Sequence, residues 1–203
     1  MMRCSRPVDV KIGVLALQGN VSEHVDAFCR ALEHRGYGAT SSVVQVRHPG
    51  DLKGCHALAI PGGESTTISR LIDKNGLYNP ICEFEGGIFA TCAGMVLIAT
   101  NVADPRIHTL GLIGMTVDRN AFGRQKESFE TDLCIYSLSG GLFHAIFIRA
   151  PVVTRVDPGV TVLASVEQGI VAAEKGRYMA LSFHPELGCD TRLHERFLKN
   201  LGL

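Results

Sequence analysis

The sequence predicts an α/β fold of three layers, with a mostly parallel β-sheet flanked by helices on both faces. Three observations support this prediction. Short apolar runs alternate with amphipathic stretches in the first half of the chain, several runs end in turns of glycine or other small residues, and 46% of the residues are hydrophobic. At 203 residues, without repeats or a low-complexity linker, the chain has the length of one domain.

The first half of the chain alternates predicted strands and helices. A helix is expected at 22–35, where apolar residues at helical spacing form one stripe that packs on the sheet. The stripe consists of Val21, Val25, Phe28, Ala31 and Leu32. The other elements are strands at 11–17, 37–46, 56–60 and 87–90, and helices at 66–74 and from Cys92 to about residue 100.

The second half of the chain contains shorter β-like stretches and one closing helix. The strands are expected at 112–117, 128–136, 145–148, 160–166, 170–174 and 178–183, and the helix at 190–200. Residues 1–10 are expected to form a short flexible extension, and residues 11–203 a single domain.

Composition argues against several classes of protein. Acidic and basic residues balance at 20 each, so no strong field favours nucleic acid or an anionic membrane. No apolar run approaches the length of a membrane span, and the N-terminus lacks a secretory apolar stretch. Seven cysteines without C-x-x-C spacing indicate reduced thiols, hence a cytoplasmic protein, and predict no metal site.

Cys92 is the first candidate for chemistry. It ends the apolar run from Ile88 and is followed by Ala93 and Gly94, small residues that allow a sharp turn into a helix. The N-terminal N–H groups and dipole of that helix would favour the nucleophilic thiolate. A buried structural cysteine at a helix start is the alternative, and this segment alone does not choose between the two.

His184, Pro185 and Glu186 are the second candidate. They follow a short apolar run, and at the end of a strand the residues at i and i+2 would lie on the same face. A thiolate nucleophile needs a base, and the base needs a group to orient it. Histidine and glutamate supply those roles, although the motif has value only beside the upstream cysteine.

Residues 61–67, PGGESTT, are the third candidate. Gly62 and Gly63 allow close approach to a ligand and can aim N–H groups at a developing oxyanion. Ser65 or Thr66 is expected to cap the following helix. An ordinary strand-to-helix turn is the alternative. All three candidates follow predicted strands, so they could share the crevice at the carboxyl ends of the sheet.

These motifs together give the chain a family resemblance from about residue 11 to the C-terminus. It resembles the class I glutamine amidotransferases, which have a flavodoxin-like fold, and more closely the glutaminase subunits of pyridoxal 5'-phosphate synthases. The Cys92 turn and His184-Pro185-Glu186 indicate the superfamily. The stretches GVLALQG at 13–19, RNAFGRQ at 119–125, SFE at 128–130 and FIRAP at 147–151 indicate the closer group.

The resemblance implies a glutaminase that needs no cofactor. Cys92 would attack L-glutamine, with His184 as acid and base and Glu186 orienting it. The oxyanion would be held by the N–H of Ala93 and one from Gly62 or Gly63. The implied glutamine contacts are Gly63, Glu64, Ser65, Arg119, Ile148 and Arg149. Without the resemblance, surface salt bridges would be the simpler interpretation of Arg119 and Arg149.

The implied partner is the synthase subunit, which would receive the ammonia and make pyridoxal 5'-phosphate, the vitamin B6 cofactor. Gln18 is implied to support the oxyanion region or the contact with that partner, although it would serve equally as a turn residue. Ala90, where the family usually has glycine, and the short connection at 85–88 depart from the family pattern. Two alternatives follow: another cysteine hydrolase of this fold, such as a γ-glutamyl hydrolase or peptidase, or a non-catalytic binding subunit.

Overall fold

The structure is a computed structural model that describes residues 9–119, 121–122, 128–136 and 138–203. Most of the expected N-terminal extension and most of the RNAFGRQ stretch therefore lie outside the described residues. The first strand begins at Val10, one residue earlier than predicted.

A ten-stranded mixed sheet runs through the molecule in the order β2-β1-β3-β4-β12-β11-β9-β6-β5, with β10 paired to β11. The strands from β2 to β12 are all parallel, whereas β11, β9 and β6 continue the sheet through antiparallel pairs. The strands are β1 Val10–Leu15, β2 Ser41–Val46, β3 Ala57–Ile60, β4 Gly87–Thr91, β5 Ala99–Val102, β6 Ile113–Asp118, β9 Val152–Val156, β10 Thr161–Val166, β11 Gly169–Lys175 and β12 Tyr178–Leu181. Strands β7 Ser128–Leu133 and β8 Phe143–Ile148 form a separate antiparallel pair.

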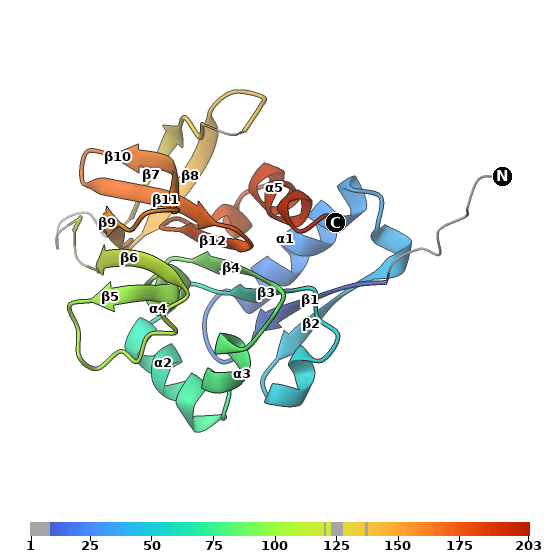
Figure 1. The fold of residues 1–203 in the computed structure, drawn as a ribbon. Coiled ribbons are helices and arrows are strands. Elements are labelled where there is room, and N and C mark those ends of the chain that lie inside the picture. Colours follow the sequence, from blue (N-terminus) through green and yellow to red (C-terminus); the bar gives the residue numbers. More distant parts are fainter. Residues whose placement is uncertain (1–8, 120, 123–127, 137) are drawn as a thin grey trace.

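Helices cover both faces of the parallel half of the sheet. Helices α1 and α5 lie together on one face, and α2 and α3 lie on the other (Figure 1). The helices are α1 Val21–His34, α2 Ser65–Lys74, α3 Tyr78–Cys82, α4 Ala93–Ile98 and α5 Arg192–Asn200. Strands β3 and β4 are buried along their whole length because they have helices on both sides.

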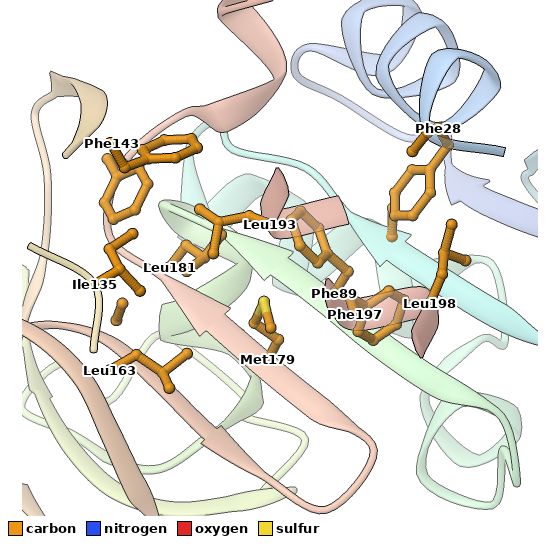
Figure 2. Packing of buried hydrophobic residues seen from close by; sticks show 14 of the residues in the cluster. Phe28, Phe89, Ile135, Phe143, Leu163, Met179, Leu181, Leu193, Phe197 and Leu198 are labelled. Carbon is orange, nitrogen blue, oxygen red and sulfur yellow. The ribbon is translucent and has the colours of Figure 1, made fainter. Parts of the chain in front are cut away.

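Two apolar clusters, one on each face, hold the layers together. On the α1 side, Phe28 meets Phe89 of β4 edge-on, with ring centres 5.4 Å apart, and Phe89 meets Phe197 of α5 at 5.3 Å. Figure 2 shows these rings beside Leu193 and Leu198 of α5. The predicted stripe of α1 therefore packs on the sheet, with Phe28, Ala31 and Leu32 fully buried.

Several predicted boundaries were wrong. Residues 38–40 form a 3-10 turn instead of the start of β2, after Gly36 with φ +83° ends the preceding helical segment. Helix α4 stops at Ile98, and the strand β5 follows at once. The continuous apolar run concealed this change, since α4 is buried on every side and has no amphipathic pattern. Strand β9 and the five-residue helix α3 were missed.

Candidate active site

Cys92 occupies a strained turn between β4 and α4. Its backbone has φ 49° and ψ −106°, a combination that residues other than glycine rarely adopt. Gly94 permits the turn, because a Cβ there would collide with the carbonyl oxygen of Ile60 in β3. The Cys92 side chain is buried, and its Sγ lies 3.6 Å from the carbonyl oxygen of Ile148. The turn thus holds the thiol beside the end of β8.

The two departures from the family pattern do not interrupt the strand that leads to Cys92. Strand β4 starts at Gly87, directly after the short connection, and runs without a break to Thr91. Ala90 is fully buried and pairs in register with Ile60 of β3 and Ala180 of β12. The extra methyl group is therefore accommodated within the sheet.

His184 and Glu186 meet beside the thiol, as predicted, but a 3-10 turn and not the end of a strand brings them together. Strand β12 ends at Leu181, and Pro185, whose ring fixes φ, starts a 3-10 turn over Pro185–Leu187. The Nδ1–H of His184 donates to Oε1 of Glu186 at 2.7 Å, and both side chains are buried. His184 and Cys92 are neighbours, because a Cβ on Gly62 would lie within 3.1 Å of side-chain atoms of both. We call these three residues the Cys-His-Glu cluster.

The electrostatics of the cluster favour a positively charged imidazole. Burial lowers the pKa of His184, but hydrogen bonds to Cys92 and Glu186 and the negative charges of both outweigh burial and raise this pKa to about 10. Burial raises the pKa of Glu186, but the neighbouring His24 and His184 outweigh it and hold the pKa below its ordinary value. An ionised carboxylate beside an imidazolium is the arrangement that supports a cysteine thiolate.

The Gly62-Gly63 turn closes over the cluster from the end of β3. A Cβ on Gly62 would collide with Cε1 of His184 and would lie 3.1 Å from Cβ of Cys92. The N–H of Gly62 donates to Oγ1 of Thr91 at 3.1 Å. Of the two glycines, Gly63 is therefore the better candidate for an oxyanion donor. The N–H of Ala93 is the second candidate, because the first residue of a helix has no intrahelical acceptor.

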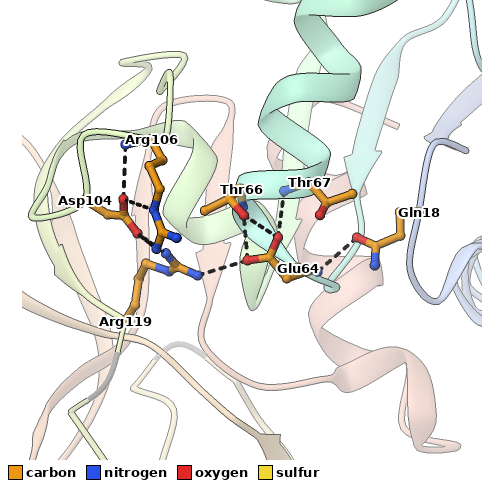
Figure 3. Close-up of polar contacts among 7 residues, drawn as sticks. All are labelled: Gln18, Glu64, Thr66, Thr67, Asp104, Arg106 and Arg119. Atoms are coloured by element: carbon orange, nitrogen blue, oxygen red, sulfur yellow. Dashed lines mark hydrogen bonds and ion pairs between the residues drawn. The ribbon is translucent and has the colours of Figure 1, made fainter.

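Glu64 caps helix α2, where Ser65 or Thr66 was predicted to do so. Its carboxylate accepts the N–H groups of Thr66 at 3.3 Å and Thr67 at 2.7 Å. Burial raises the pKa of Glu64, but the hydrogen bonds from Thr66 and Thr67 outweigh it and lower this pKa to about 2. Its own N–H donates to Oε1 of Gln18 at 3.0 Å, so Gln18 supports the glycine turn (Figure 3). Ser65, the first residue of α2, is buried beneath the loop.

Arg119 lies between two carboxylates at the edge of this loop. One guanidinium nitrogen is 2.5 Å from Oδ2 of Asp104, and another is 3.1 Å from Oε1 of Glu64 (Figure 3). Asp104 also binds Arg106 at 2.7 Å, and hydrogen bonds from Arg106 and the charges of both arginines hold the pKa of Asp104 well below its usual range. Arg149 follows β8 with φ 45°, beside the Ile148 carbonyl that faces the thiol.

Four polar residues near the site were missed by the sequence analysis. Thr91 and His24 are fully buried and lie behind the cluster, Asn20 approaches Glu186, and Asp104 anchors Arg119. The only available signals were a hydroxyl at the end of an apolar run and a histidine on the apolar face of a predicted helix. Neither signal shows which residue the side chain contacts, because the contacted residues are distant in sequence.

Comparisons with known proteins agree on one family. The sequence profile of the SNO glutamine amidotransferase family matches residues 14–202. The pyridoxal 5'-phosphate synthase subunit PdxT of Methanoregula boonei is 71% identical over 96% of this chain and 100% of that protein. Its counterpart in Methanosphaerula palustris is 59% identical over 97% of this chain and 100% of that protein.

Solved structures confirm the predicted fold class. A crystal structure of a glutamine amidotransferase superposes with a TM-score of 0.83 at 43% identity, covering 95% of this chain and 99% of that one. A glutamine amidotransferase from Thermotoga maritima, 13% identical, shares the fold with a TM-score of 0.60 over 96% of this chain and 84% of that one. The fold is that of glutamine amidotransferases. With the profile match and the close relatives, the chain belongs to the SNO glutamine amidotransferase family.

Residues 9–119, 121–122, 128–136 and 138–203 contain neither a candidate membrane span nor a candidate metal site. Within these ranges, no helix is both long and apolar enough to cross a membrane. The same part of the chain contains no group of three or more histidine, cysteine, aspartate or glutamate side chains suited to hold a metal ion. The six described cysteines are free thiols.

Proposed function

We propose that this chain hydrolyses L-glutamine to L-glutamate and ammonia, and that it supplies the ammonia to a pyridoxal 5'-phosphate synthase subunit. The observation that carries the proposal is the Cys92 thiol on a strained strand-to-helix turn, next to a buried and hydrogen-bonded His184–Glu186 pair. Membership of the SNO family and the PdxT relatives support the substrate and the product.

The reaction starts from a thiolate on Cys92. Its Sγ attacks the carboxamide carbon of glutamine, and the carbonyl oxygen becomes an oxyanion held by the N–H groups of Ala93 and Gly63. His184 then gives a proton to the departing nitrogen, which leaves as ammonia and forms a γ-glutamyl thioester. Water, deprotonated by His184, attacks the thioester, whose C–S bond breaks to release glutamate and to restore the Cys92 thiolate beside the His184 imidazolium.

The loop between β3 and α2 and the end of β8 bind the rest of the substrate. Arg119 and Arg149 suit the α-carboxylate of glutamine, and the ionised Glu64 suits its α-ammonium group. Gly63, Ser65 and Ile148 contact the substrate through the turn and the strand end that flank the thiol. The paired carboxylates around Arg119 hold its guanidinium in place before glutamine arrives.

The synthase subunit is the partner, because free ammonia is protonated and lost in water at neutral pH. The printed name of the relatives, a subunit of pyridoxal 5'-phosphate synthase, supports this partner. We place the reaction in the cytoplasm, in keeping with the free thiols. Residues 11–203 form one domain, which the single ten-stranded sheet supports.

The test is an assay of ammonia release from L-glutamine by the purified chain, alone and with its cognate synthase. A γ-glutamyl peptide serves as the competing substrate, and a Cys92→Ser variant as the background. We expect release from glutamine, faster with the synthase, and little reaction with the peptide. Preference for the peptide would identify a γ-glutamyl hydrolase, and equal release by Cys92→Ser would reject the proposed nucleophile.

A further inference from the structure

A buried histidine lies behind the Cys-His-Glu cluster and has no part in the reaction above. His24, in the first turn of α1, is fully buried. Its Nε2 is 3.0 Å from Oγ1 of Thr91 and 3.5 Å from Oε1 of Glu186. Thr91 precedes the nucleophile, and its Oγ1 also accepts the N–H of Gly62. One imidazole nitrogen therefore faces both the carboxylate that orients His184 and the hydroxyl that holds the glycine turn.

The surroundings of His24 select one tautomer. Among the described residues, Nδ1 of His24 has no hydrogen-bond partner. A buried N–H without an acceptor is rarer and costlier than a buried lone pair without a donor, so the proton belongs on Nε2. There it points toward a hydroxyl oxygen and a carboxylate oxygen. Nδ2 of Asn20, the residue before α1, donates to the same Oε1 of Glu186 at 3.4 Å. The beginning of α1 therefore supplies two N–H groups next to that oxygen.

His24 acts as a neutral donor at neutral pH. Burial lowers its pKa, and of the ionisable groups that face it, Glu186 and Glu23 raise the pKa while His184 lowers it. The nearby His194 of α5 has a pKa that burial lowers, that His24 lowers further and that Glu186 raises. A neutral imidazole donates its N–H to Thr91, presents the positive end of that N–H dipole to Oε1 of Glu186 at 3.5 Å, and leaves the negative charge of Glu186 to His184.

We propose that His24 is a positioning residue for glutamine hydrolysis, which fixes Oε1 of Glu186 and Oγ1 of Thr91 through one Nε2–H group. This inference rests on the proposed function. Without His24, the Glu186 carboxylate can rotate away from His184, and the Thr91 hydroxyl that holds Gly62 loses its anchor. The general base and the turn beside the oxyanion site would then lose their alignment together, because both depend on the same nitrogen.

The experiment compares His24→Leu and His24→Gln with a matched control, His194→Leu. His194 is also a fully buried histidine, and neither of its ring nitrogens has a hydrogen-bond partner among the described residues. It stacks on Phe89 with centres 4.7 Å apart, and burial lowers its pKa to about 3, so its loss removes ring packing and no charge at neutral pH. Each variant is assayed for kcat and KM with glutamine in the presence of the synthase, for the pH dependence of kcat, and for thermal stability.

We expect His24→Leu to lower kcat by roughly 10- to 100-fold with little change in KM, which is the usual effect of misplacing a reacting group. The acidic limb of kcat should move to higher pH, because Glu186 loses the N–H dipole that lies 3.5 Å from its Oε1 and favours its ionised form. His24→Gln, whose amide N–H has a similar reach, should restore most of kcat. His194→Leu should lower the melting temperature while kcat and its acidic limb stay close to wild type.

Several results would overturn the proposal. One is a folded His24→Leu variant whose kcat and acidic limb are those of the wild type. Another is a His24→Leu variant whose loss of kcat matches that of His194→Leu. If His24→Leu does not fold, Thr91→Val removes the shared hydroxyl at constant volume, and wild-type behaviour there overturns the proposal equally. If the wild type releases no ammonia from glutamine, the proposed function fails separately. In that case the pH dependence of Cys92 alkylation by iodoacetamide tests the role of His24. If the acidic limb of the alkylation rate is the same in His24→Leu as in the wild type, the proposed role of His24 is rejected.

Discussion

Replacing Glu186 with glutamine should separate the charge of the buried pair from its shape. Glutamine keeps an oxygen that can accept the Nδ1–H of His184, but it removes the negative charge. Cys92 and Glu186 together raise the pKa of His184 from its ordinary 6.5 to about 10, which corresponds to about 5 kcal/mol in favour of the imidazolium. If Glu186 supplies half of this, its loss costs roughly 2–3 kcal/mol, or roughly 30- to 150-fold in kcat.

Two measurements test this reasoning. The kcat for glutamine should fall by the stated factor in Glu186→Gln, and the NMR titration midpoint of the His184 ring should move to lower pH, since a group stabilised in its charged form loses its proton earlier once that stabilisation is removed. Glu195→Gln is the matched control, because Glu195 also pairs with a histidine, His34, at 3.1 Å but in a more exposed position. A Glu186→Gln variant that keeps more than half of the wild-type kcat, with an unchanged His184 midpoint, would refute the argument.

Three further substitutions test other parts of the site. Cys92→Ser should lower ammonia release by roughly a thousandfold or more with an unchanged melting curve; the exposed Cys134→Ser, assayed in parallel, should retain wild-type activity. Asp104→Asn should raise KM for glutamine about tenfold with kcat nearly unchanged, because Arg119 loses the carboxylate that anchors it; a change in kcat alone would contradict this role. Gly63→Val should abolish activity even with the synthase, since φ is +157° and a Cβ would lie 3.0 Å from Oε1 of Gln18.

The sequence predicted the parallel half of the fold well because its strands are short, apolar and bounded by turns. It could not predict which strands belong to one sheet: β7 and β8 form a separate pair, although their residue pattern resembles that of the other late strands. Strand β9 was missed because Thr154 and Arg155 break its apolar run and are exposed. Such boundaries depend on which neighbour covers each face, and this is a tertiary property.

The candidate site was predicted at the level of its motifs and missed at the level of its supports. Cys92, His184 and the glycine turn lie together because β3, β4 and β12 are adjacent parallel strands and all three segments follow their carboxyl ends. His24 and Asp104 could not be predicted, since each acts on residues far away in sequence. A short motif contains the residues that react, whereas the residues that hold them in place are brought there by the packing of distant segments.

The strain at Cys92 explains why these supports matter. A residue in a sparsely populated backbone conformation costs of order 1–3 kcal/mol and persists only where its surroundings impose it. Here the N–H of Cys92 donates to the carbonyl oxygen of Leu181 at 2.8 Å, and Thr91 before it is held by His24 and Gly62. Strand pairing on both sides and a buried polar contact on α1 thus fix the same turn. Relaxing either one would let the thiol move away from His184, so the energy that holds the strained turn in place is also what keeps the nucleophile beside its base.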